Sequence, residues 1–152
     1  MGVFYHFFKE VCRFFGSHAI GNPVRIFFYK LSGIKIGRNV LLNQGLTIID
    51  NGGKSMIVVE DGVSFAPNVT LVAKSSPMYI HPAVKRESLP IKEGRILIRE
   101  GVWIGTGAVI LPGVTVGKCS MIGANAVVNK DVPEFTIVAG IPAQPIRQIE
   151  KR

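Results

Sequence analysis

The chain has 152 residues, of which 18 are Lys or Arg and 10 are Asp or Glu, so its formal net charge is +8 at pH 7. This length favours a single domain, and a content of 47% hydrophobic and 18% charged residues excludes a disordered chain. The 17 Gly and 9 Pro are typical of a turn-rich β architecture rather than a helical bundle. The basic excess suits a nucleic acid, a membrane surface or a phosphorylated ligand, and composition does not choose among them.

The N-terminal residues have the pattern of an amphipathic helix, because the polar positions within residues 3–15 share one helical stripe. These polar positions are His6, Lys9, Glu10 and Arg13, and most of the others are Phe or Val. We expect this helix to end near Gly16. A second short helix is expected from Pro23 to about Leu31, since Pro favours the first turn of a helix.

Two interpretations of residues 3–31 stay open. The Phe-rich face packs against the rest of the fold or a neighbouring subunit, or it lies in a membrane interface. In the second interpretation, basic side chains meet anionic headgroups, and the candidates are Lys9, Arg13, Arg25 and Lys30. Neither interpretation makes these helices transmembrane.

Cysteine usage and the start of the chain indicate the compartment. Cys12 and Cys119 lie far apart and suggest no disulfide framework, so a reducing compartment is expected. No apolar run reaches the roughly 20 residues of a membrane-spanning helix. The first ten residues lack a basic start and are a poor match to a signal peptide. We therefore expect a cytoplasmic protein that could lie peripherally on the inner face of the membrane.

A β-branched aliphatic residue recurs every six positions in the second half of the chain, a period that neither an α-helix nor an alternating strand produces. These positions are Ile98, Ile104, Ile110, Val116, Ile122 and Val128. Four residues after each stands a small or apolar residue: Val102, Ala108, Val114, Ser120, Ala126 and Val132. The same frame occurs earlier at Ile36, Leu42 and Ile48, and at Val59, Phe65 and Leu71, with a slip near residues 52–55. Short strands separated by tight turns predict a three-sided coil with the aliphatic side chains stacked inside.

Residues 74–95 interrupt the six-residue frame, and their Ser, Pro and charged residues do not fit a regular coil. We expect about twenty residues to project as a loop. Loops of this length in a compact domain are often functional, and a tolerated insertion is the alternative.

Several stretches carry more than the bare period: residues 66–69, 102–105, 110–117, 122–133 and 138–147. They resemble the acyltransferase branch of the hexapeptide-repeat family, and most of all the maltose, galactoside and polysaccharide O-acetyltransferases. The resemblance covers about residues 30–149 and implies a mainly β fold, a left-handed parallel β-helix. It also implies acetyl-CoA as co-substrate, a homotrimer with active sites between neighbouring prisms, and a sugar or polysaccharide-precursor hydroxyl as acceptor. We expect residues 1–32 to form a helical segment and residues 33–152 to form the acyltransferase domain.

Carried over by position, six residues resemble the places that contact CoA: Trp103, Thr106, Ala124, Asn129, Lys130 and Arg147. The pantetheine arm is an extended amide chain that can bond to turns of small residues. Lys130 and Arg147 would meet CoA phosphates through charge-assisted hydrogen bonds. The alternative is that Trp103 is a packing residue and that the two cations are only solvated.

The acceptor side of the site matches the family less well. Asn43 resembles an acceptor-binding asparagine, although Asn also suits turns. The family places a catalytic histidine at a position that aligns with Lys74 or Ser76 here, and neither is His. We assign these two residues to substrate binding and His81, in the same loop, to the role of base that accepts the hydroxyl proton. An ordinary exposed loop histidine is the alternative, and Lys74 would serve as base only if burial lowered its pKa.

Other function classes fit less well. The three His and two Cys are not spaced as metal ligands, so no metal is expected. Nucleic-acid binding is not supported, because the aromatic and basic residues gather in an amphipathic helix. The second hypothesis is a non-catalytic trimeric protein that binds CoA or a sugar, or acts as a scaffold, and has lost the catalytic histidine.

Overall fold

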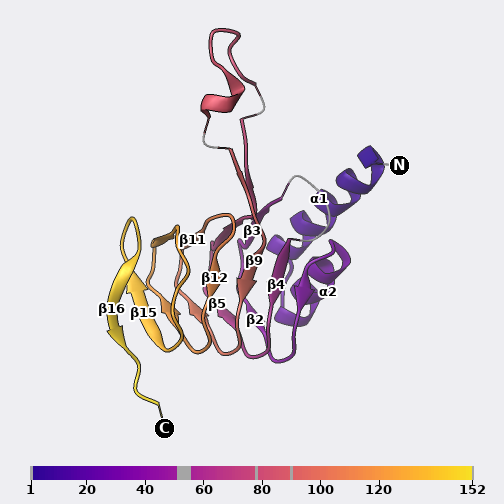
Figure 1. Cartoon of the computed structure of the whole chain (residues 1–152). Coiled ribbons are helices and arrows are strands. Elements are labelled where there is room, and N and C mark those ends of the chain that lie inside the picture. Colours follow the sequence, from indigo (N-terminus) through magenta and orange to yellow (C-terminus); the bar gives the residue numbers. More distant parts are fainter. Residues whose placement is uncertain (1, 51–55, 78, 90, 152) are drawn as a thin grey trace.

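A computed structural model describes residues 2–50, 56–77, 79–89 and 91–151 (Figure 1). Two helices, α1 (Gly2–His18) and α2 (Asn22–Leu31), precede a stack of short strands that form three main sheets. Sheet A contains β1 (Lys35–Ile36), β4 (Ile57–Val59), β9 (Ile96–Ile98) and β12 (Thr115–Val116). Sheet B contains β2 (Leu41–Leu42), β5 (Ser64–Phe65), β10 (Trp103–Ile104), β13 (Met121–Ile122), β15 (Thr136–Ala139) and β16 (Gln144–Gln148). Sheet C contains β3 (Thr47–Ile49), β6 (Thr70–Val72), β11 (Val109–Ile110) and β14 (Val127–Val128).

Successive strands belong to successive sheets, so the chain winds as a three-sided coil, and each coil pairs in parallel with its neighbours. Ile104, for example, is in register with Phe65 of the preceding coil and Ile122 of the following coil. The six residues from Ile98 to Val128 in the six-residue frame are at most 3% exposed. The predicted parallel coil with an internal aliphatic column is therefore confirmed. The predicted slip near residues 52–55 lies outside the described residues.

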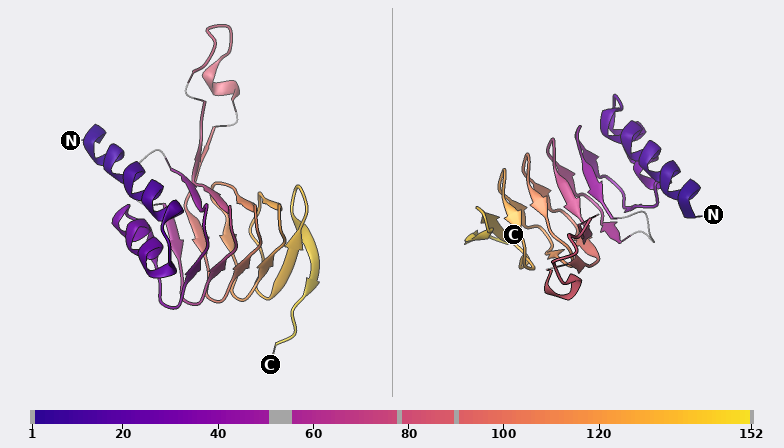
Figure 2. Two further views of the ribbon diagram at one scale, coloured as in Figure 1. Left: turned by 180° about the vertical axis from the view of Figure 1, so that it is seen from behind. Right: turned by 90° about the horizontal axis from the view of Figure 1, so that it is seen from above.

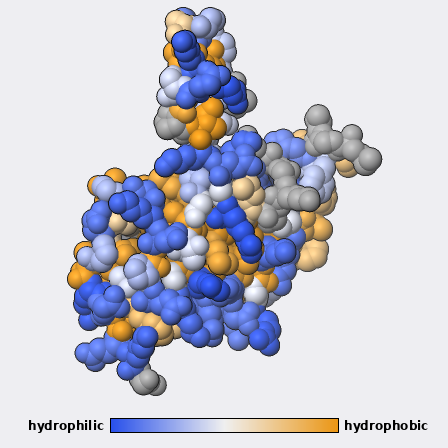
Figure 3. Space-filling model, in the orientation of Figure 1, coloured by the Kyte–Doolittle hydropathy of each residue, from blue (hydrophilic) through white to orange (hydrophobic). Residues whose placement is uncertain are grey.

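The three corners of the prism differ in chemistry. The turns that follow sheet B, here called the groove corner, begin at Asn43, Ala66, Gly105 and Gly123. The turns that follow sheet C, here called the loop corner, include Asp50, Ala73, Pro112 and Asn129. The turns that follow sheet A, here called the charged corner, carry ion pairs: Arg38–Asp61, Arg99–Glu60 and Lys118–Glu100. Figure 3 shows hydrophilic residues along this lower edge of the prism.

The predicted projecting loop leaves the loop corner between β6 and β9 (Figure 1). Its stem is an antiparallel ribbon of β7 (Lys74–Ser75) and β8 (Lys92–Glu93), and a short 3-10 helix, η1 (Arg86–Ser88), lies nearer the tip. The ribbon carries the rest of the loop away from the prism (Figure 2).

Helices α1 and α2, here called the helical cap, cover the first coil, whose strands β1 to β3 pair with the second coil on one side. Polar side chains of the cap bond to the backbone of this coil. Asn22 accepts from the Leu42 amide and donates to the Val40 carbonyl, at 2.7 and 2.8 Å, and Arg25 donates to the Leu42 carbonyl at 3.0 Å. Tyr29 donates to the Leu46 carbonyl, and burial raises the pKa of its hydroxyl.

The first helix extends to His18, beyond its expected end near Gly16. A Cβ atom at Gly16 would lie 3.1 Å from the Tyr29 ring, so this glycine makes room for the second helix instead of ending the first.

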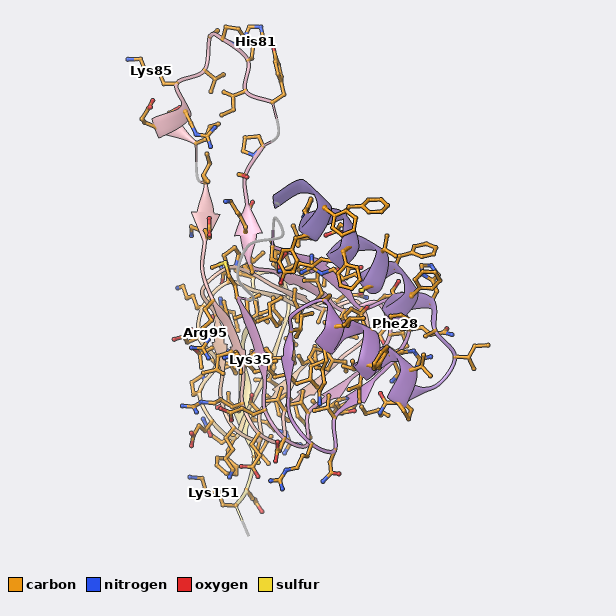
Figure 4. The ribbon with its side chains drawn as sticks, turned by 90° about the vertical axis from the view of Figure 1, so that its right-hand side faces the viewer. Phe28, Lys35, His81, Lys85, Arg95 and Lys151 are labelled. Atoms are coloured by element: carbon orange, nitrogen blue, oxygen red, sulfur yellow. The ribbon has the colours of Figure 1, made fainter. Side chains whose placement is uncertain are left out.

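The structure contradicts one part of each interpretation of the cap: the Phe face does not pack on the prism of the same chain, and the basic residues of α1 do not face outward. Lys9 and Arg13 are 1% and 6% exposed and lie on the inward side, where Arg13 pairs with Asp50 at 2.6 Å. Arg25 is half-buried by its bond to the first coil, so these three cations do not face solvent as headgroup contacts would. The Phe side chains point outward and do not pack on the prism of the same chain (Figure 4). The reason is that the first coil presents backbone groups that require polar partners.

Candidate active site

A pocket of about 350 Å³ lies at the groove corner between β10, β13 and β15. Its lining is mostly apolar and consists of Ala66, Trp103, Gly105, Thr106, Met121, Ile122, Gly123, Ala124 and Ile137. Trp103 and Met121 are register partners, as are Met121 and Ile137, so their side chains form one outward row on sheet B. The Trp103 side chain is 52% exposed and forms a wall beside turns of small residues.

Glycine is required in these turns because the coils approach each other closely. A Cβ atom at Gly105 would lie 2.6 Å from the Ala124 amide nitrogen, and one at Gly123 would lie 2.7 Å from the Ala139 Cβ. The Gly105 amide donates to the Ile122 carbonyl at 2.8 Å, which joins the two coils at the pocket floor. The outcome is a narrow, smooth surface that an extended chain can follow.

The structure brings together three of the six residues that sequence reasoning assigned to CoA: Trp103, Thr106 and Ala124 all line this pocket. Arg147 lies on β16 in register with Ile137, next to the pocket wall, and is exposed. Asn129 and Lys130 are exposed in the turn after β14, at the loop corner, and do not join the pocket of the same chain.

Two lining residues, Met121 and Ile137, were missed by sequence reasoning. Met121 precedes Ile122, an inward residue of the six-residue frame, and therefore points outward beside Trp103. Ile137 lies beyond the frame, before the buried Val138, and pairs with Met121.

Asn43 stands at the groove corner of the first coil, in the same column of turns as Ala66 and Gly105. It is half-buried, and its side-chain amide donates to the Phe65 carbonyl at 2.9 Å. This bond holds the turn and directs the Asn43 side chain along the column that leads to the pocket.

The candidate residues of the loop lie at a different corner. Lys74 pairs with Glu93 across the ribbon at 2.8 Å. Ser76 is half-buried just above the ribbon. His81 is exposed near the tip (Figure 4), and its Nδ1 accepts a hydrogen bond of 3.2 Å from the Ala83 amide. In this loop conformation the ring uses its lone pair for that bond, so a base role requires the loop to change shape.

Other clusters of charged groups are ion pairs. A second pocket, at the charged corner, is lined by Arg38, Glu60, Asp61 and Glu100. Hydrogen bonds from the amide and guanidinium of Arg38 lower the pKa of Asp61, as expected for a paired carboxylate. Among the described residues, no group of three or more His, Cys, Asp or Glu could hold a metal ion. In the same part of the chain, neither helix has the length and hydropathy to cross a membrane.

Comparison with known proteins agrees with this geometry. Residues 95–130 match the family model for the bacterial transferase hexapeptide (six repeats). The chain is 39% identical over 148 residues to the galactoside O-acetyltransferase of Escherichia coli K12, covering 95% of this chain and 68% of that protein. For three other curated relatives, the alignment with this chain covers only 53% to 59% of the relative's length.

Solved structures share the fold over almost the whole chain. A maltose O-acetyltransferase from Clostridium difficile 630 superposes with a TM-score of 0.69 at 25% identity, covering 98% of this chain and 88% of that one. A hexapeptide-repeat acetyltransferase from Vibrio cholerae, solved with acetyl-CoA, superposes with a TM-score of 0.78 at 23% identity, covering 98% and 89%. Given the repeat, the pocket and the 39% identity to a galactoside O-acetyltransferase, the chain belongs to the hexapeptide-repeat acyltransferase family.

Proposed function

We propose that the protein is an acetyl-CoA-dependent O-acetyltransferase that acts on a hydroxyl of a sugar or polysaccharide precursor in the cytoplasm. The observation that carries the proposal is the groove-corner pocket, where Trp103, Thr106 and Ala124 line a narrow surface of small-residue turns. The relatives named above act on galactoside and maltose, and one solved relative holds acetyl-CoA. No metal takes part in the proposed reaction.

In the proposed reaction, the acceptor hydroxyl attacks the thioester carbonyl of acetyl-CoA. The C–S bond breaks, the acetyl group moves to the sugar oxygen, and CoA leaves as a thiol that takes up the proton. The hydroxyl is a poor nucleophile until a base accepts its proton, and this role is assigned to His81. Asn43 orients the acceptor, and Lys74 and Ser76 lie at the base of the loop that covers it.

A homotrimer of left-handed prisms would complete the site. The pocket and the loop occupy different corners of one prism, and the loop extends away from its own coils (Figure 1). In the proposed trimer, the loop of one subunit reaches the groove corner of the next. The loop corner, with Asn129 and Lys130, would then face the CoA bound there, and Arg147 would contact its phosphates from β16.

Release of free thiol from acetyl-CoA, measured with a panel of sugars and oligosaccharides, tests the activity. Thiol release that depends on one acceptor class supports the proposal. His81→Ala is expected to lower kcat by about 100-fold or more, the usual contribution of a general base. His18→Ala is the matched control, because His18 is also exposed but lies on α1. Intact activity in His81→Ala would remove His81 from the mechanism.

A non-catalytic CoA-binding or scaffold protein is the second candidate. Two points favour it: the family's histidine position aligns with Lys74 or Ser76, neither of which is His, and the lone pair of His81 is already used by the Ala83 amide. If no acceptor yields thiol while CoA still raises the Tm, the binding function replaces the enzymatic one.

A further inference from the structure

The outward side of the helical cap is covered by apolar side chains, here called the aromatic face: Phe4, Phe7, Phe14, Phe15, Ile20 and Phe27. Their exposed fractions run from 50% for Phe15 to 90% for Ile20. Contiguous exposed apolar patches of this kind are rare on monomeric soluble proteins and mark interaction sites.

Three rings of this face, together with the half-buried Phe28, form a continuous row across both helices. Phe14 and Phe15 meet edge to face with ring centres 5.8 Å apart, and Phe15 stacks on Phe28 at 5.5 Å. Phe27 and Phe28 continue the row on α2, again at 5.5 Å. Figure 4 shows ring side chains on the side of α1 that faces away from the strands, and Figure 2 shows both helices on one side of the coil stack.

The orientation of the cap is determined by its inward contacts. Arg13 reaches Asp50, and Asn22 and Arg25 reach the first coil, so rotation that hid the rings would break these bonds. The aromatic face is therefore a built surface of the folded chain and remains uncovered by the prism that carries it.

Charge selects the kind of partner. Of the four Lys or Arg between Phe4 and Leu31, Lys9 and Arg13 are buried and Arg25 is half-buried, and the one acid, Glu10, is paired with Arg13 at 2.9 Å. Lys30 is exposed on α2, one helical turn from Phe27. Among the described residues Lys30 takes part in no ion pair, so its positive charge remains beside the aromatic face for a partner of opposite charge. An anionic surface has the complementary charge.

We propose that the aromatic face docks the protein on an anionic membrane surface, with α1 and α2 lying in the plane of the interface. The rings insert at the boundary between headgroups and acyl chains, and Lys30 contacts anionic headgroups. Because Lys9 and Arg13 face the prism, burial of the apolar rings supplies most of the binding free energy, and Lys30 supplies the preference for anionic lipid. In the proposed trimer, three such faces would add their contributions.

Co-sedimentation of the full-length protein with vesicles tests the proposal. One set of vesicles is phosphatidylcholine alone, and the other contains about 30% phosphatidylglycerol, which gives it a negative surface charge. We expect binding to the anionic vesicles and much weaker binding to the neutral ones. The double variant Phe7→Ser, Phe14→Ser should lower the partition coefficient by about tenfold or more, as removal of two exposed rings predicts. Tyr79→Ser is the matched control, since Tyr79 is 74% exposed but lies in the projecting loop.

A second pair of variants tests the electrostatic part. Lys30→Gln should weaken binding to anionic vesicles severalfold, whereas Lys151→Gln, at the other end of the molecule (Figure 4), should not. If Phe7→Ser, Phe14→Ser fails to fold by circular dichroism, Phe4→Ser, Ile20→Ser replaces the two most exposed members of the face.

Absence of wild-type binding to anionic vesicles would overturn the proposal, as would unchanged binding by the Phe variants. A change of oligomeric state in the Phe variants, without vesicle binding by the wild type, would assign the face to a second copy of the chain. The assay needs no enzymatic activity. Vesicle binding without acetyl transfer would therefore refute the proposed function and leave the docking surface in place.

Discussion

Replacing Asp50 with Asn tests whether the buried ion pair holds the helical cap on the first coil. The two side chains are 7% exposed for Arg13 and 2% for Asp50, and their charged atoms lie 2.6 Å apart. Asn keeps the shape and one acceptor oxygen, so the variant chiefly removes the negative charge. Arg13 would then retain Glu10 at 2.9 Å, but that carboxylate is half exposed and weakly coupled.

The expected cost is about 3 kcal/mol, the lower end of what breaking a buried pair costs, because the acceptor oxygen remains. For a chain of this size each kcal/mol lowers the Tm by roughly 2–4 °C, which gives a decrease of about 6–12 °C. Thermal unfolding measures the shift. Hydrogen exchange should show faster opening at the Leu42 amide, which the cap protects through Asn22.

Two controls make the test specific. Glu100→Gln breaks the exposed pair with Lys118, whose side chains are 54% and 44% exposed, and should leave the Tm nearly unchanged. The double variant Arg13→Met, Asp50→Leu removes both charges and should recover much of the lost stability. A Tm for Asp50→Asn within about 2 °C of that for Glu100→Gln would refute the assigned role of the pair.

Further predictions concern a turn, the response to pH and the pocket. Gly107→Ala should lower the free energy of unfolding by about 1–2 kcal/mol more than Gly113→Ala, as measured by urea titration. Both glycines have a positive φ, but only at Gly107 would a Cβ collide, because it would lie 2.2 Å from the carboxamide oxygen of Asn125. Equal costs would contradict this. Burial raises the pKa of the Cys12 thiol, so the unfolded chain loses this proton first and stability should fall as pH rises above about 8.5. Cys12→Ser should flatten that part of the Tm profile, and an unchanged slope would exclude the thiol. Trp103→Ala should weaken CoA binding by about tenfold in calorimetry, whereas Leu41→Ala, also outward on sheet B, should not.

The coil could be predicted from the sequence because its period is unique. Ile98, Ile104 and Ile110 repeat at a spacing that no helix or simple strand uses, and each of them is fully buried. The direction of the helical cap could not be predicted. Periodicity shows that Lys9 and Arg13 share a face with each other, but it does not show which face is turned inward. That choice depends on the backbone groups of the first coil, which become visible only in three dimensions.

Part of the candidate site could be predicted from the sequence, because glycines mark the turns where neighbouring coils approach each other. Gly105 and Gly123 reveal where coils touch, and Trp103 stands beside them, so that wall of the pocket follows from the sequence. Met121 and Ile137 carry no signature, since any outward strand position accepts them. The position of His81 depends on the shape of a long loop, which short-range patterns do not determine.

The way both ends of the coil stack are closed has a consequence for how the protein behaves at high concentration. A column of identical parallel coils with a bare end can serve as a template on which another molecule adds its own first strand. Here side chains of Asn22, Arg25 and Tyr29 occupy the backbone groups at one end, and the antiparallel strand β16 covers β15 at the other. Neither closure repeats the geometry of the coil, so neither can propagate it. The parallel column therefore has a defined length, with the helical cap at one end and β16 at the other.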